Sequence, residues 1–307
     1  MSEFLVYLAT MSGIYGILSL SLNLQYGLTG LANFGHVAFF MLGAYTSTIL
    51  VLLAQLPFPL GLLGGALAAA LFGGLIALPT ANLQQDYWAI TTLAAAEIVR
   101  LVFLNQPLKG PYVGASFGVG GIPQPWRQAF SAATYPYFYL ALVLACLLAT
   151  YAVVSWLARM PFGRTLRAIR EGDAVPLALG KNVGRFRVKV MMLGGALGGV
   201  AGSLFAHYNA FIDPYYFLPL ETFLVWAMVL LGGCGNHLGA LLGTVTVLAF
   251  YHSTRFLKDY LPLPSQTLAS LRMVVIGVLI ILVVLFLPQG LLPERKRRYG
   301  PRRPARS

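Results

Sequence analysis

Residues 4–85, which begin FLVYLATMSGIYGILSLSLN and end GGALAAALFGGLIALPTANLQQ, decide the fold class. This run of 82 residues contains no Asp, Glu, Lys or Arg. One helical membrane span needs roughly 20 apolar residues, so the run is long enough for several spans. Membrane β-strands would alternate apolar and polar residues in segments of about 10, whereas residues 140–157 are apolar at nearly every position. The sequence therefore predicts an all-α transmembrane bundle.

The composition of the whole chain agrees with a membrane protein. Only 10% of the 307 residues are charged, 58% are apolar, and the mean hydropathy is +0.75. Soluble domains usually carry about 25% charged residues, so a soluble enzyme is excluded. We expect a polytopic transmembrane domain of about 8–9 membrane segments over residues 1–292, followed by a basic tail at 293–307.

The apolar segments fix the expected spans, and one of them is too long for a single crossing. Residues 222–254 carry no charge, and as one helix they would extend roughly 50 Å, beyond an ordinary span of about 30 Å. In their middle lies LGGCGNHLG at 231–239, whose glycines break helices. We expect two short segments or a re-entrant pair meeting there. The other predicted spans are 4–24, 37–56, 60–79, 87–104, 135–157, 190–211 and 273–292.

Basic residues gather in two places and predict the orientation. Eight lie in residues 159–189 and seven in the C-terminal tail, which is 15 of the 21 in the chain. Cytoplasmic segments are enriched in Lys and Arg, so we expect this loop and the C-terminus in the cytoplasm and, with five spans before residue 159, the N-terminus outside. The positive charge thus marks one side of a lipid bilayer, and we expect no nucleic-acid partner.

A second glycine-broken stretch, LNLQYGLTGLANFGH at 22–36, supplies candidate pathway residues. Non-helical backbone at membrane depth is tolerated only where it is buried in protein or lines a cavity. Asn23, Asn33 and His36 are therefore candidates for the substrate pathway, and Asn236 joins them from the other broken stretch. A solvated loop, or hydrogen bonds that merely hold helices together, is the alternative. Both stretches combine Gly, Asn and His, which hints at two related halves.

The segment TTLAAAEIVR at 91–100 places an ionisable group inside a predicted span. Such groups tend to face the bundle interior, so Glu97 is a pathway candidate together with Thr91 and Thr92. Alternatively Glu97 pairs structurally with Arg100, three residues away on the same helix face. If Glu97 coupled transport to an ion, the chain would be a self-sufficient secondary transporter.

Small residues recur every four positions in the predicted span 190–211. Gly194, Gly198 and Gly202 would lie on one face of a helix and let a neighbouring backbone approach closely. We expect these glycines to serve helix packing.

The basic loop contains MPFGRTLRAIREGDAVPLALGKN at 160–182, in which apolar residues and a helix-ending glycine stand between the charges. We expect one short helix at 164–171 and another at 174–179, capped by Gly180. A loop that only marks topology needs no such order, so the pattern favours docking to a protein. The candidate docking residues are Gly163, Arg164, Arg167, Arg170, Glu171, Ala174, Leu177, Leu179 and Gly180.

The sequence supports no enzyme site, since its match to G-x-S-x-G at 114–118 lies in a Gly-rich loop between predicted spans and not between a strand and a helix. It lacks the G-x-x-x-x-G-K-[ST] phosphate loop, so another subunit would bind ATP if transport is ATP-driven. Its four His are scattered, and no paired carboxylates share a span, so we expect neither an enzyme nor a bound metal or cofactor.

At the basic loop the chain resembles a known family. GRTLRAIRE at 163–171 and ALGKN at 178–182 are similar to the cytoplasmic loop of permease subunits of branched-chain amino acid ABC transporters, the LivM-like family. Blocks at 22–45, 87–100 and 196–236 resemble the same family. Pro176 departs from the expected pattern and leaves the register of the second short helix open.

This resemblance implies a heteromeric importer in the inner membrane. It implies a second related permease subunit, two cytoplasmic ATPase subunits that bind ATP and Mg²⁺, and a periplasmic substrate-binding protein. The loop from Gly163 would fit a groove on an ATPase subunit. The expected substrates are branched-chain or other neutral amino acids, with urea or short amides as the alternative within the family.

Overall fold

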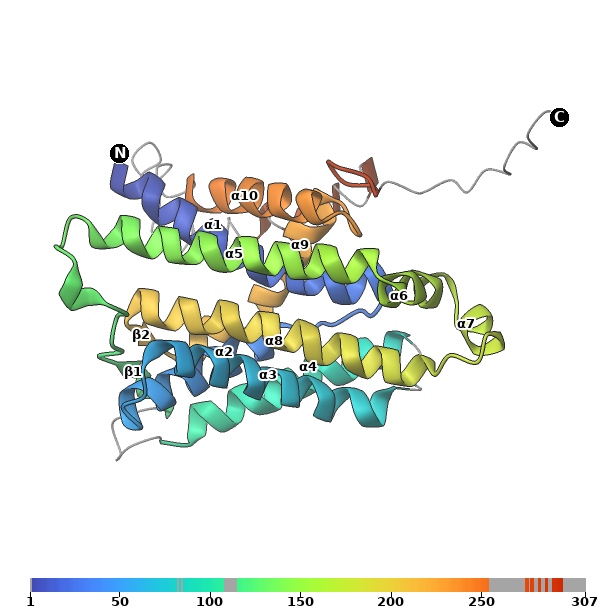
Figure 1. Cartoon of the computed structure of the whole chain (residues 1–307), viewed down its shortest axis with the longest axis horizontal. Coiled ribbons are helices and arrows are strands. Elements are labelled where there is room, and N and C mark those ends of the chain that lie inside the picture. The colour runs from blue at the N-terminus through green and yellow to red at the C-terminus, as the bar shows by residue number, and fades with distance from the viewer. Residues whose placement is uncertain are drawn as a thin grey trace.

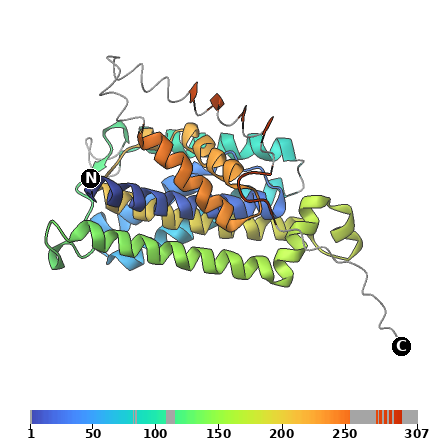
Figure 2. The same ribbon diagram turned by 90° about the horizontal axis from the view of Figure 1, so that it is seen from above.

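The computed structural model describes residues 2–81, 83, 85–107, 115–253, 274–275, 277–278, 281–282, 285–286 and 289–294. Most of the predicted span 273–292 and the tail from 295 onwards lie outside these residues. The described chain is an all-α bundle whose long helices run along the long axis of the molecule, as the two views show (Figure 1 and Figure 2). Five helices in this part are long and apolar enough to cross a membrane. They are α1 (Ser2–Leu22), which continues into a π-helical turn (Asn23–Gly27), α3 (Phe58–Thr80), α4 (Gln85–Asn105), α5 (Tyr135–Arg159) and α8 (Val183–Asn209).

The two ends of the bundle differ in structure (Figure 1). The short helices α6 (Pro161–Glu171) and α7 (Ala174–Ala178) project from one end. At the other end the two-residue strands β1 (Val119–Gly120) and β2 (Phe211–Ile212) pair antiparallel, and the N-terminus lies at this end too. We call them the α6–α7 end and the β1–β2 end. Single 3-10 turns occur at Ala115–Phe117, Arg127–Ala129 and Pro214–Phe217.

The stretch 222–254 forms two short helices, as predicted. Helix α9 (Pro219–Gly232) is followed by α10 (His237–Ser253), and the break falls on the glycine junction. Gly233 and Gly235 have φ values of 114° and 82°, a conformation that glycine adopts without steric cost. The helix axis therefore changes direction where the sequence places glycines.

The predicted span 37–56 is also not an ordinary crossing. Helix α2 (Val37–Thr48) runs into a second π-helical turn (Ile49–Leu53), and it begins inside the bundle after a non-helical segment at 30–36. In this crossing the first part is therefore non-helical, ending in a turn at 34–36, and only the rest is helix.

Glycines let α2, α3 and α8 pack backbone to backbone. A Cβ at Gly199 of α8 would lie 2.6 Å from the carbonyl oxygen of Gly65 on α3. A Cβ at Gly65 would in turn lie 2.7 Å from the carbonyl oxygen of Gly43 on α2. Contacts this close exclude any side chain. We call this region the glycine seam.

The three glycines singled out from their spacing lie on the α8 face next to α2 and the first π-helical turn. A Cβ at Gly198 would be 2.9 Å from the Cβ of Phe39, and one at Gly202 would overlap the carbonyl oxygen of Phe40. Gly194 lies against the side chain of Gln25. The α8 glycines next to them in sequence face α3 instead.

Helix α8 begins at Val183, seven residues before the predicted span at 190. Asn182 caps its first turn, because its Oδ1 accepts a hydrogen bond of 3.0 Å from the backbone N–H of Arg185. The helix is therefore longer than the predicted span 190–211 at its start, since Arg185, Arg187 and Lys189 of the predicted loop segment 159–189 belong to it. Hydropathy could not place this boundary, since the first two turns are basic.

Candidate functional site

A chain of buried polar side chains joins the first π-helical turn to the non-helical segment 30–36. Asn33 donates from Nδ2 to Oε1 of Gln25 at 2.8 Å, and its Oδ1 accepts from the N–H of Gly35 at 2.9 Å. Gln25, Asn33 and His36 are all fully or almost fully buried. Buried polar groups cost free energy unless they are hydrogen-bonded, so this network fixes the path of the segment.

The geometry also assigns the tautomer of His36. Its Nε2 lies 3.2 Å from the carbonyl oxygen of Leu18, which can only accept, so Nε2 carries the proton. Nδ1 is then the acceptor for Asn33 Nδ2 at 3.4 Å. The imidazole is therefore neutral, and the network from Gln25 to His36 has no net charge.

Helix α9 meets the start of α2 inside the bundle. The backbone N–H of Val37 donates to Oγ1 of Thr222 at 3.0 Å, and Nε1 of Trp226 donates to the carbonyl oxygen of Asn33 at 3.0 Å. At a rise of 1.5 Å per residue, Thr222 lies about 15 Å from the end of α9 at Gly232. Two helices shorter than the bundle therefore begin near each other, well inside it, and run toward opposite ends.

An acidic side chain that the sequence reasoning missed lies in the first turn of α9. Glu221 accepts a hydrogen bond from the hydroxyl of Tyr15, which lies in the second half of α1, at 2.8 Å. The signal for it in the sequence is a single carboxylate directly before the uncharged stretch 222–254. Gln25 was missed as well, although it lies in the glycine-broken stretch 22–36. Each is a candidate for the site alongside Asn33 and His36.

The structure gathers only some of the predicted pathway residues. Thr92 belongs to the group, because its Oγ1 accepts from the N–H of Phe34 at 3.2 Å. Thr91 bonds to the carbonyl oxygen of Tyr87 on its own helix at 2.8 Å. Glu97 lies further along α4 and pairs with Arg100, whose Nε is 2.9 Å from Oε2.

The other two predicted pathway residues, Asn23 and Asn236, lie at the α9–α10 junction instead. Asn23 accepts from the N–H of Gly235 at 2.8 Å, and its Nδ2 is 3.1 Å from Nδ1 of His237. Asn236 caps α10, since its Oδ1 accepts from the N–H of Leu238 at 3.1 Å and from that of Gly239 at 3.2 Å. Both asparagines thus hold the junction together.

Helices α6 and α7 present one buried and one exposed side. Leu166 and Ile169 pack α6 against the bundle, and Gly163 allows close contact with α5, since a Cβ there would lie 2.5 Å from the carbonyl oxygen of Ala158. Leu177 and Leu179 at α7 are 57% and 72% exposed. Exposed apolar side chains outside the membrane-spanning helices indicate a surface that contacts another protein.

The docking residues predicted from the loop divide between these two sides. Arg164, Glu171, Ala174 and Gly180 are exposed, and Gly180 ends α7 with φ of 69°. Arg167 and Arg170 instead point at Glu294, with Nε 3.4 Å and Nη2 2.7 Å from its carboxylate oxygens.

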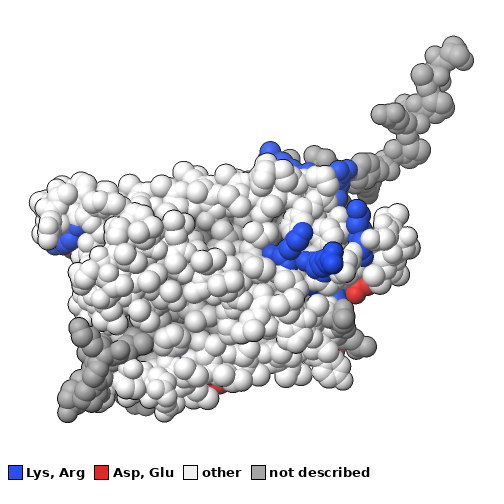
Figure 3. Space-filling model, turned by 60° about the horizontal axis from the view of Figure 1, so that its bottom comes forward, with Lys and Arg blue, Asp and Glu red and all other residues white. Residues whose placement is uncertain are grey.

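Charge is distributed unevenly along the molecule. In the face shown by Figure 3, Lys and Arg gather at the α6–α7 end, whereas the side of the bundle is almost free of charge. An uncharged belt between charged ends suits a lipid bilayer.

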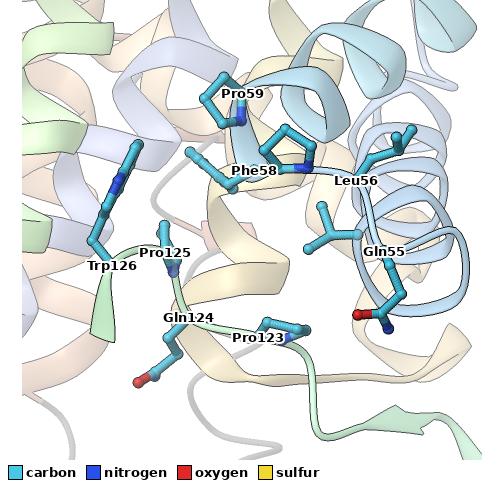
Figure 4. Close-up of a pocket in the computed structure, with 10 residues that line it drawn as sticks. Gln55, Leu56, Phe58, Pro59, Pro123, Gln124, Pro125 and Trp126 are labelled. Carbon is cyan, nitrogen blue, oxygen red and sulfur yellow. The ribbon is translucent and has the colours of Figure 1, made fainter. Parts of the chain in front are cut away.

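A pocket of about 310 Å³ lies at the β1–β2 end between two proline-containing segments (Figure 4). Pro57, Phe58 and Pro59 form one wall, and Pro123, Gln124, Pro125 and Trp126 form the other. His207 lies beside it, with its ring centroid 4.9 Å from that of Phe58. The sequence reasoning did not single out these residues.

These features define a multi-pass helical membrane protein with a basic, helical loop at one end. Residues 4–284 match the family model described as the branched-chain amino acid transport system / permease component. The chain belongs to this family of transport subunits, which confirms the predicted fold class and the predicted transport function. No solved structure matches the chain.

Two of the most similar curated relatives carry the name LivM. The high-affinity branched-chain amino acid transport system permease protein LivM of Salmonella typhimurium is 32% identical over 94% of this chain and 70% of its own length. The probable branched-chain amino acid transport permease protein LivM of Methanocaldococcus jannaschii is 32% identical over 92% of this chain and 91% of its own. LivH of Escherichia coli is 26% identical over 74% of this chain and 77% of its own.

Proposed function

We propose that this permease component carries branched-chain or other neutral amino acids, driven by ATP that separate subunits hydrolyse. The observation that supports this most is the neutral network of Gln25, Asn33 and His36 beside the inner ends of α2 and α9. A zwitterion without side-chain charge is recognised by helix ends and amides rather than by a row of fixed charges. Urea or short amides are the alternative substrates, since the same groups would bind them.

The proposed energy coupling runs through α6 and α7. The exposed Leu177 and Leu179, together with the exposed Arg164 on α6, would enter a groove on an ATPase subunit. ATP and Mg²⁺ would bind to that subunit, and this chain would bind no cofactor. The arrangement of a buried α6 face and an exposed α7 tip supports this role.

The proposed assembly contains further subunits. A second permease subunit related to LivH, two ATPase subunits and a periplasmic binding protein would complete the importer. In the membrane, the α6–α7 end and the C-terminus would face the cytoplasm, and the N-terminus would lie outside. Two observations support this orientation: the basic residues at the α6–α7 end, and the N-terminus at the opposite end.

Reconstitution tests this proposal. The chain is co-expressed with its partner subunits, placed in vesicles with ATP inside, and assayed for uptake of radiolabelled leucine delivered by the binding protein. We expect uptake that requires ATP and is reduced by excess unlabelled valine but not by urea. Uptake by this chain without any ATPase subunit would contradict the proposal.

An ion-coupled secondary transporter remains testable in the same vesicles. In that mechanism Glu97→Gln would abolish a response of uptake to a proton gradient. The pairing of Glu97 with Arg100 supports a structural role instead, so we expect the variant to keep ATP-driven uptake.

A further inference from the structure

Four segments that are far apart in sequence meet at the α6–α7 end. They are the last turn of α6, the π-helical turn Asn23–Gly27, the α9–α10 junction and the short segment 289–294. The π-helical turn leads into the first broken crossing, which consists of the non-helical segment before α2 and α2 itself. The junction directly follows α9, the short helix that forms the second broken crossing. This meeting point therefore connects the docking loop with both irregular crossings.

Arg170 lies at the centre of the meeting point. One of its guanidinium nitrogens, Nη1, donates to the carbonyl oxygen of Gly27, and Nη2 donates to Oε2 of Glu294 at 2.7 Å. The backbone of Gly235 lies against the same side chain, since a Cβ there would be 3.1 Å from Nη1 and 2.8 Å from Oε2 of Glu294. One planar side chain thus touches three segments besides its own.

The two broken crossings also touch each other at this point. A Cβ at Gly27 would lie 2.6 Å from the backbone nitrogen of Gly235, and that nitrogen donates to Oδ1 of Asn23 at 2.8 Å. A displacement of α6 that moves Gly27 must therefore also move the start of the junction. Beyond Gly27 the chain leaves the helix at residue 30 and continues to Asn33 and His36.

Arg187 provides a comparison within the same end of the molecule. It too joins a carboxylate to a backbone carbonyl: Nη2 is 2.8 Å from Oδ2 of Asp173, and Nη1 donates to the carbonyl oxygen of Ala81 at 2.9 Å. Ala81 directly follows the uninterrupted helix α3. The two arginines make the same kind of contact, but Arg170 holds the irregular crossings and Arg187 holds the continuous scaffold.

We propose that Arg170 is the positioning residue through which α6 moves the two broken crossings during the transport cycle. This inference rests on the proposed function as an ATP-driven importer. The guanidinium suits the role because its fork of donors reaches a carbonyl and a carboxylate at once, whereas the ammonium group of lysine is a compact point charge. The bond to Gly27 transmits the displacement, and Glu294 fixes the orientation of the guanidinium.

The complete importer in vesicles tests the assignment through the amount of leucine taken up per ATP hydrolysed. For Arg170→Ala we expect this ratio to fall about tenfold, the loss of roughly one charge-assisted hydrogen bond. The ATPase subunits should still co-purify, because the exposed tip of α7 is unchanged. Arg170→Lys should give an intermediate ratio, and Glu294→Gln should keep the ratio within about threefold because the bond to Gly27 remains.

Arg187→Ala is the matched control, and we expect its ratio within about twofold of the unaltered complex. Equal ratios for Arg170→Ala and Arg187→Ala would overturn the assignment. If the alanine variant does not assemble, the lysine variant decides: an unaltered ratio there overturns the assignment, and a lowered ratio in an assembled complex supports it. Failure of the unaltered complex to use ATP for uptake would instead refute the proposed function.

Discussion

The glycine seam and the network around Asn33 are two buried regions that lie side by side but are held together in different ways. In the seam, backbones of α2, α3 and α8 touch with no side chain between them, as at Gly199 and Gly65. In the network, side chains of Gln25, Asn33 and His36 occupy the space between segments and bond to one another.

The difference indicates that the glycine seam is a rigid frame and that the network around Asn33 is a site whose contacts can change. Close backbone packing permits one arrangement, since interiors this dense cannot shift without overlap. Hydrogen bonds between neutral groups can be exchanged for bonds to a solute at little net change in free energy. We therefore expect the seam to be required for folding and the network to be required for transport.

The largest effect should come from placing a side chain in the seam. A Cβ at Gly202 already overlaps the carbonyl oxygen of Phe40, so Gly202→Leu should prevent the bundle from forming. Size-exclusion chromatography in detergent should show little or no monodisperse protein. Gly74→Ala is the control, because its Cβ would meet only the flexible side chain of Met192, at 3.3 Å, and we expect normal elution.

A smaller effect, confined to function, should follow from a change in the network. Asn33→Leu removes the partner of Gln25, whose Nε2 already has no hydrogen-bond partner, and leaves a buried amide unpaired. We expect the protein to elute normally and the uptake rate to fall about tenfold. Thr91→Val, which removes a hydroxyl outside the network, should leave uptake within about twofold. Equal losses in both variants would mean that the network has no special role.

A change at the docking surface lies outside both buried regions and should weaken one interface only. Leu179→Asp puts a charge on a side chain that is 72% exposed, so the fold should be unchanged. We expect the amount of co-purified ATPase subunit to drop about fivefold, comparable to the loss of one apolar contact at an interface. Leu179→Met keeps the apolar surface and should co-purify normally. Normal co-purification of the aspartate variant would exclude this side chain from the interface.

The smallest effect is expected on the face of α3 that points away from the seam. Leu67 is 61% exposed, and truncation to alanine leaves every seam contact in place. For Leu67→Ala we expect a thermal unfolding midpoint and an uptake rate close to those of the unaltered protein. A marked loss of uptake with normal elution would instead indicate that a partner subunit covers this face.

Much of the frame could be predicted because it depends on local sequence. Hydropathy located the long helices, glycine clusters located both irregular crossings, and the pattern ending at Gly180 located the two short helices of the docking loop. The start of α8 was missed because its first turns are basic, so the apolar pattern begins later than the helix. Asn236 caps a helix, which an asparagine just before an apolar segment often does.

The site could be predicted only in part because it depends on contacts across the chain. Asn23 meets Gly235, 212 residues away, and Val37 meets Thr222, 185 residues away. No local pattern reveals such pairs. Glu221 and Gln25 were missed for the same reason: their importance follows from the partners that the fold brings to them.

The long separation between Val37 and Thr222 also constrains how the protein is made. Ribosomes add about 5–20 residues per second, so the 185 residues between the two partners take roughly 10–40 seconds to synthesise. During this interval the non-helical segment 30–36 lacks α9, whose Thr222 and Trp226 bond to the residue after it and to Asn33, and lipid does not tolerate such uncovered backbone. The nascent segment must therefore wait in the insertion machinery or at the membrane surface. Biogenesis of this protein should depend on membrane-protein chaperoning more than that of a bundle of continuous helices.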